Sequence, residues 1–88
     1  MTQELNVIHN EDEHCFEVFI KGYRAYLDYR PLGGNQMDYC HTFVPEDLRG
    51  KGVAAVLTRA ALDYAKQNNL EVIPSCVYVE SFVKKHGK

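Results

Sequence analysis

The chain has 88 residues and a mass of 10.1 kDa, so we expect one domain over residues 1–88 and no second one. Hydrophobic residues make up 45% of the sequence and charged residues 25%, a balance that argues against intrinsic disorder. The formal net charge is −2 and the sequence pI is about 6.0. Because this charge creates no basic field that attracts phosphates, we expect neither nucleic acid nor a membrane as a partner.

Two features of the sequence indicate a soluble, cytoplasmic protein. Residues 1–14 are acidic and polar, unlike a secretory signal peptide, and no apolar run approaches the roughly 20 residues that span a bilayer. The three cysteines, Cys15, Cys40 and Cys76, are odd in number and widely spaced, unlike the dense, even sets of disulfide-stabilised domains. We therefore expect reduced thiols, any of which could serve chemistry or packing.

The sequence gives no indication of a metal site. It contains no Cys-x-x-Cys pair, and its four histidines, His9, His14, His41 and His86, are scattered along the chain. Zinc sites draw on cysteines and histidines that are clustered at short, regular spacings. We therefore expect no bound metal.

The first third of the chain predicts antiparallel strands. A weak strand is expected at residues 5–8, and residues 14–20 are rich in aromatic and β-branched side chains that favour a strand. After a turn at Lys21 and Gly22, residues 23–30 alternate apolar and polar side chains. This period of two is typical of a strand with one buried face.

A second turn and a further strand complete this series. Residues 31–36 include two glycines and an asparagine, which tolerate the positive φ angles of tight turns. Residues 37–44 (MDYCHTFV) then predict a strand that pairs with the preceding one. Its period of two places a set of side chains on one face, namely Met37, Tyr39, His41 and Phe43.

Beyond Pro45 the pattern changes to that of a helix. Apolar residues recur at helical spacings at Val53, Val56, Leu57, Ala60, Ala61, Tyr64 and Ala65. The Asn68-Asn69 pair predicts the end of this helix, because asparagine tolerates the left-handed cap. Residues 70–73 predict a short strand and residues 77–85 a last helix. The order ββββ-α-β-α describes an α+β fold with one parallel, right-handed crossover.

Residues 49–54 (RGKGVA) carry the clearest chemical signal, between a strand and the start of the long helix. A helix N-terminus presents unpaired N–H groups and the positive end of the helix dipole. Glycines let the backbone approach a phosphate closely, and Arg49 and Lys51 add positive charge. The loop therefore predicts an anion site, although Gly50 and Gly52 could equally be turn residues alone. The nucleotide-binding patterns GxxxxGK[ST] and GxGxxG are absent.

This loop and its surroundings resemble a known family. The spacing Arg49-x-x-Gly52-x-Ala54 is similar to the Q/R-x-x-G-x-G/A loop of the GNAT acetyltransferase superfamily, which binds the pyrophosphate of acetyl-CoA. The segments HTFVP at 41–45 and IPSC at 73–76 resemble the very small, single-domain GNAT-like proteins. The resemblance covers residues 38–86 and implies a truncated GNAT-like fold. Unlike larger members, the chain lacks helices between its first strands and the final strands that usually build the acceptor pocket.

The resemblance implies that acetyl-CoA, or coenzyme A, binds as a substrate. The loop residues that would contact its pyrophosphate are Arg49, Gly50, Lys51, Gly52, Val53 and Ala54. The backbone of Thr42, Phe43 and Val44 would hydrogen-bond the pantetheine amides by strand addition, while their side chains could also serve the core. Phe82 and Lys85 on the last helix would flank the adenosine.

Cys76 and His41 form the catalytic pair that the resemblance implies. Cys76 would face the sulfur end of the cofactor, although a cysteine here could equally be a small buried apolar residue. His41 would act as a general base with an ordinary pKa of about 6.5, or it could be a core histidine. Tyr78 lies near the position of a tyrosine that protonates the departing thiolate in larger enzymes. Cys15 and Cys40 are assigned to packing.

The implied function is an N-acetyltransferase that moves an acetyl group from acetyl-CoA to an amine of a small molecule or peptide. One alternative is a module that binds CoA or acetyl-CoA without significant turnover. Another is a plain interaction domain, which would bind no CoA. We expect a monomer or a weak homodimer.

Overall fold

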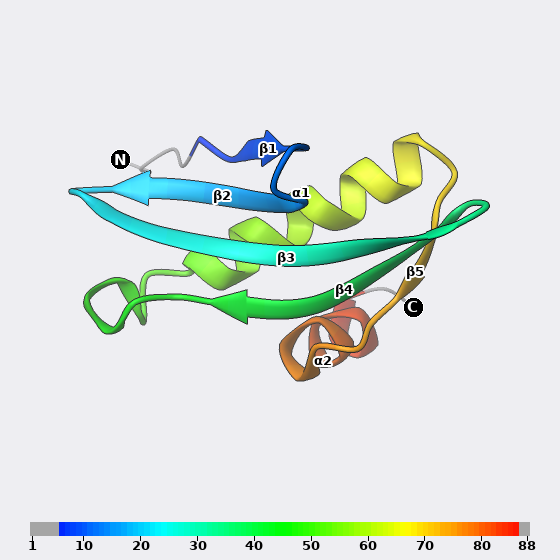
Figure 1. The fold of residues 1–88 in the computed structure, drawn as a ribbon. Helices are drawn as coiled ribbons and strands as arrows, with labels where there is room; N and C mark the ends of the chain where they lie inside the picture. The colour runs from blue at the N-terminus through cyan, green and yellow to red at the C-terminus, as the bar shows by residue number, and fades with distance from the viewer. Residues whose placement is uncertain (1–5, 87–88) are drawn as a thin grey trace.

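A computed structural model of the chain describes residues 6–86, and its framework is one five-stranded sheet in the order β1-β2-β3-β4-β5 (Figure 1). The strands are β1 (Ile8–Asn10), β2 (Cys15–Ile20), β3 (Tyr23–Gly33), β4 (Gln36–Phe43) and β5 (Glu71–Ile73). A short 3₁₀ helix, η1 (Glu46–Leu48), leads into helix α1 (Val53–Gln67), and helix α2 (Val77–His86) follows β5. Neighbouring strands are antiparallel except β4 and β5, which are parallel and joined through α1.

This order confirms the predicted α+β arrangement of four strands, a helix, a strand and a helix. The first strand begins at Ile8 instead of covering residues 5–8, and Leu5 lies outside the described residues. The predicted helix stop is also confirmed, because Asn69 takes a left-handed φ of 57° just after α1. None of the helices in the described part of the chain is long and apolar enough to cross a membrane.

The core lies between one face of the sheet and the two helices. Alternate residues of the strands point into it, namely Phe16, Val18, Ala25, Leu27, Tyr29, Met37 and Tyr39. The apolar stripe of α1 covers them, and α2 contributes Val79 and Phe82. Tyr39 is fully buried, and its hydroxyl donates a 2.6 Å hydrogen bond to the carbonyl of Ala61 in α1. This bond fixes the distance between the middle of β4 and the middle of α1.

A bulge in β4 changes which of its side chains face this core. Tyr29 of β3 pairs with Tyr39, but the preceding residue Asp28 pairs with His41, so Cys40 is an extra residue in β4. A bulge of this kind shifts the alternation of all residues that follow it. Thr42, which pairs with Leu27, therefore faces the helices, and His41 faces the opposite side.

The expectation that Met37, Tyr39, His41 and Phe43 share one face is therefore wrong. Met37 and Tyr39 are buried, whereas His41 and Phe43 are exposed on the outer face of the sheet. The ring of Phe43 lies 5.5 Å from that of Tyr26, and the ring of His41 lies 6.2 Å from the same tyrosine.

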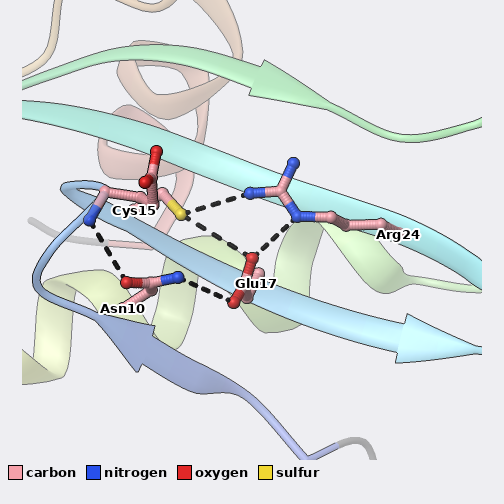
Figure 2. Close-up of polar contacts among 5 residues, drawn as sticks. Asn10, Cys15, Glu17 and Arg24 are labelled. Atoms are coloured by element: carbon pink, nitrogen blue, oxygen red, sulfur yellow. Dashed lines mark hydrogen bonds and ion pairs between the residues drawn. The ribbon is translucent and has the colours of Figure 1, made fainter.

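The outer face of the sheet holds a compact polar cluster around Glu17 (Figure 2). Arg24 binds the Glu17 carboxylate at 2.7 Å, and the amide of Asn10 donates to it at 3.2 Å (Figure 2). Cys15, which is fully buried, lies beside this pair, with its sulfur 3.5 Å from the Arg24 guanidinium. Burial would raise the pKa of Glu17, but the hydrogen bonds from Arg24 and Asn10 outweigh it and the pKa is lowered. The packing role predicted for Cys15 fits this environment.

We predict that Tyr39→Phe destabilises the domain, because it leaves a buried carbonyl without one of its partners while keeping the ring. The expected loss is about 1–2 kcal/mol in the free energy of unfolding. For a domain of this size that corresponds to a fall of roughly 4–16 °C in the melting midpoint. Tyr26→Phe on the outer face is the matched control and should change the midpoint little. Equal midpoints for the two variants would show that the bond to Ala61 contributes nothing.

Candidate functional site

A cavity of about 230 Å³ opens at the N-terminus of α1. It is lined by Val44, Leu48, Arg49, Gly50, Gly52, Val53, Ala54, Ala55 and Tyr78. Gly50 and Gly52 have φ angles of 83° and 77°, in the left-handed region where a side chain would strain the backbone. The two glycines therefore let the chain turn sharply from η1 into α1, and Gly52 caps the helix with its backbone.

The electrostatics of this cavity favour an anion. The N–H groups of Val53, Ala54 and Ala55 belong to the first helical turn and have no partner within the helix. No side chain of the described residues caps this end, and its first turn carries no acidic residue. The positive end of the helix dipole therefore faces the cavity.

Of the two basic residues of the loop, Arg49 lines this cavity, whereas Lys51 lines a neighbouring one with Asp47 and Tyr23. The Nε of Arg49 donates a 3.1 Å hydrogen bond to the carbonyl of Val44, which holds the guanidinium at the end of β4. Lys51 is exposed on the same loop. A helix N-terminus with basic neighbours is the arrangement that proteins use to bind phosphate groups.

Next to this cavity, β4 has an edge with no strand beside it. β5 pairs with β4 only up to the Asp38–Ile73 pair. The N–H of Cys76 then donates to the carbonyl of Tyr39 at 3.0 Å, and the chain turns into α2. Within residues 6–86, no strand covers the β4 edge from 40 to 43. An extended ligand can therefore lie along this edge by backbone pairing.

Cys76 lies at the N-terminus of α2, directly opposite this part of β4. Its sulfur is 3.4 Å from the hydroxyl oxygen of Thr42. Burial raises the pKa of the Cys76 thiol, but hydrogen bonds from the Thr42 side chain and from the N–H groups of Val79, Tyr78 and Thr42 outweigh burial and lower the pKa. The surroundings therefore stabilise a thiolate at Cys76.

The surroundings of Cys15 and Cys40 have the opposite effect on the thiol pKa. Burial is the main cause that raises the pKa of Cys15 and the pKa of Cys40. Nearby carboxylates, Glu17 for Cys15 and Asp38 for Cys40, raise these pKa values further. Among the three cysteines, Cys76 is thus the one whose thiolate is favoured, and the packing role predicted for the other two is consistent with their surroundings.

The structure brings Cys76 together with Thr42 and does not bring it together with His41. His41 is exposed on the outer face because of the Cys40 bulge, and Cys76 packs on the side of the helices. The hydrogen-bonding partner of Cys76 is therefore the Thr42 hydroxyl. The sequence predicted a role for the backbone of Thr42 but not for its side chain. Tyr78, expected to protonate the departing thiolate, is 39% exposed and lines the cavity at the start of α1.

The two residues proposed for the adenosine end lie in different surroundings. Phe82 is only 7% exposed and packs in the core, with the Arg59 guanidinium 5.6 Å above its ring. This packing differs from the expected contact with adenosine, which needs an accessible ring. Lys85 is exposed on α2. Ala55 and Leu48 also line the cavity, but they were not predicted from the sequence. Ala55 could have been predicted, because it carries the third N–H group of the helix start.

Comparisons with known proteins agree with this arrangement. The family model described as GCN5-related N-acetyl-transferase matches residues 15–88. The chain is 36% identical over 84 residues to Protein NATD1 of Bos taurus, an alignment that covers 93% of this chain and 74% of the relative. It is 32% identical over 87 residues to Protein NATD1 of Xenopus tropicalis, covering 97% and 80%.

A solved structure gives the same result. The NMR solution structure of a GCN5-like protein from Staphylococcus aureus superposes with a TM-score of 0.72 at 28% identity. The superposition covers 96% of this chain and 82% of the other. The small sheet, the glycine loop before α1 and the matched sequence together show that the chain belongs to the GCN5-related N-acetyltransferase family.

Proposed function

We propose that this domain binds acetyl-CoA and transfers the acetyl group to an amine of a small molecule or peptide. The observation that carries the proposal is the placement of two helix N-termini along one open strand edge. The start of α1 forms an anion cavity next to Val44, and the start of α2 stabilises a thiolate at Cys76 beside Thr42. The cavity at α1 suits a diphosphate, and the region around Cys76 suits an acyl thioester.

The residues present fit the two ends of the substrate. The N–H groups at the start of α1, with Arg49 and Lys51, would hold the diphosphate. The backbone at the end of β4, which no strand of the described residues covers on this side, would bind the pantetheine arm as an added strand, apart from the Val44 carbonyl, which already accepts from Arg49. Val44 and Thr42 are two residues apart, about 7 Å along a strand, so the arm would lead from the cavity towards Cys76.

Cys76 would then supply the nucleophile. Its thiolate attacks the carbonyl carbon of the thioester, a new C–S bond to Cys76 forms, and the C–S bond to CoA breaks with release of the CoA thiolate. The acceptor amine attacks the acetylated Cys76, forms the amide and regenerates the Cys76 thiolate. The amine gives up one proton and the CoA thiolate takes up one, both exchanged with solvent at this open edge, whereas Tyr78, the donor that the resemblance implies, lines the cavity assigned to the diphosphate. His41, on the other face of the sheet, has no part in these steps.

We predict that Ala54→Asp abolishes CoA binding without weakening the fold. The new carboxylate lies in the first turn of α1, where it stabilises the helix by about 0.3–1 kcal/mol but repels the diphosphate. In the parent, CoA at about 100 times its dissociation constant should add about 2.7 kcal/mol to the stability, which thermal melting detects.

Ala54→Asn is the control for this experiment, because it has the same shape without the charge and should keep most of the stabilisation by CoA. The position is preferable to Gly52, where the φ of 77° means that any side chain strains the loop. A parent whose midpoint does not move in millimolar CoA would contradict the proposed function.

We predict that Cys76→Ala keeps its affinity for CoA but loses most acetyl transfer, measured as release of free CoA thiol in the presence of a panel of amines. Without an acceptor, intact-mass analysis of the parent after acetyl-CoA should show one added acetyl group. Cys40→Ala removes the other partly buried thiol and should keep both the activity and the added mass.

The possible outcomes separate the two mechanisms and the alternative function. Full activity of Cys76→Ala, with no acetylated parent, would mean that the amine attacks the thioester directly. CoA binding without turnover of any amine would favour the module that only binds CoA.

A further inference from the structure

A second cavity, of about 320 Å³, lies at the other end of the molecule from the glycine loop. Its walls come from the turn between β1 and β2, from β3, from the start of β4 and from the C-terminal part of α1 with Leu70 after it. In Figure 1 these segments meet towards the right, whereas the start of α1 lies to the left. The two cavities share no lining residue. This volume is in the range of sites that hold small molecules.

Three of the ten residues that line this second cavity carry aromatic rings. Tyr29, Tyr64 and His14 line it, and the rings of His14 and Tyr29 are 5.5 Å apart. His14 has a φ of 56°, a conformation uncommon for residues other than glycine, and its carbonyl accepts a 2.9 Å hydrogen bond from the N–H of Tyr29. The turn is thereby tied to β3 with the histidine ring against the tyrosine.

His9 packs against two of these rings, Tyr29 and Tyr64, and against Phe16. Its ring stacks on Phe16 at 4.3 Å and meets Tyr64 edge-on at 4.4 Å. Its Nε2 lies 2.5 Å from the hydroxyl of Tyr29. Burial lowers the pKa of His9, although Glu11 opposes this, and burial raises the pKa of Tyr29 to about 12. His9 and Tyr29 therefore meet as neutral groups that share one hydrogen bond.

The charge around the cavity is negative. Glu11 lines it with a largely exposed carboxylate, and Asp12 and Glu13 follow in the same turn. The residues that line the cavity, all of them in the described part of the chain, include neither lysine nor arginine. Aromatic ring faces with a carboxylate at the rim attract cations, above all alkylated ammonium groups, which lose little hydration when they enter such a site.

We propose that this cavity is a second ligand site, which binds the alkylated ammonium group of a small molecule beside the rings of Tyr64 and His14, with Tyr29 packed behind His14 and Glu11 at the rim. The site does not depend on acetyl transfer, since it uses none of the residues at α1's N-terminus or around Cys76. Its ligand class follows from the rings and the carboxylate together.

Choline chloride is the probe, titrated into ¹⁵N-labelled protein and followed by amide chemical shifts. Shifts are expected at Glu11, His14, Gly33 and Gly34, with little change at the residues 50–55 of the other cavity. The neutral isostere 3,3-dimethylbutan-1-ol has the same shape without the charge. It should bind about 5- to 30-fold more weakly, the factor that a cation–π contribution of about 1–2 kcal/mol produces.

Two variants and a control complete the test. Glu11→Gln and Tyr64→Leu should each weaken choline binding several-fold, whereas Glu13→Gln, in the same acidic turn but outside the lining, should leave it nearly unchanged. Glu11 is exposed, so an unchanged melting midpoint of Glu11→Gln shows that the fold is intact. Equal affinity for the neutral isostere, no shifts with choline, or shifts that neither variant reduces would each overturn the proposal.

Discussion

One extra residue in β4 determines which side chains of that strand face the two helices. Because Cys40 bulges out of the pairing with β3, the side chains of β4 exchange faces from His41 onward. Thr42 therefore points towards the helices and contacts the sulfur of Cys76, while His41 points away. Without the bulge, the imidazole and not the hydroxyl would face α2. The lowered pKa of the Cys76 thiol thus rests on a hydroxyl and backbone N–H groups, which need no neighbouring charge.

The N-termini of α1 and α2 provide local positive potential on this side of the sheet. The chain as a whole carries a formal net charge of −2, so attraction of the anionic substrate that we propose has to be local. α1 supplies that local potential where Gly52 opens its first turn, and α2 supplies it at Cys76. Both act on the short stretch of β4 that β5 leaves uncovered after the Asp38–Ile73 pair. A thin sheet with two short helices is sufficient for this geometry because the backbone provides most of the polar groups.

Much of this arrangement could be predicted from sequence, because it depends on local patterns. The stripe from Val53 to Ala65 defines α1, and the glycines of the loop match their positive φ angles. The bulge could not be predicted, since residues 37–44 continue their alternation without a glycine or proline to mark it. The second cavity was missed for another reason: Tyr29 and Tyr64 satisfy the periodicity of core residues, and only tertiary packing joins them to His14 and Glu11.

The most direct test of the account is the pH dependence of Cys76 alkylation by iodoacetamide, followed by peptide mass analysis with and without acetyl-CoA. A lowered pKa keeps the thiolate populated at lower pH, so the rate should rise with a midpoint below the ordinary value of 9.0, whereas the midpoint of Cys40 should lie above it and fully buried Cys15 should not react. Thr42→Val should move the Cys76 midpoint upwards, and acetyl-CoA should protect Cys76 from alkylation in the parent. A Cys76 midpoint above 9.0, or alkylation at the same rate with saturating acetyl-CoA, would contradict the account.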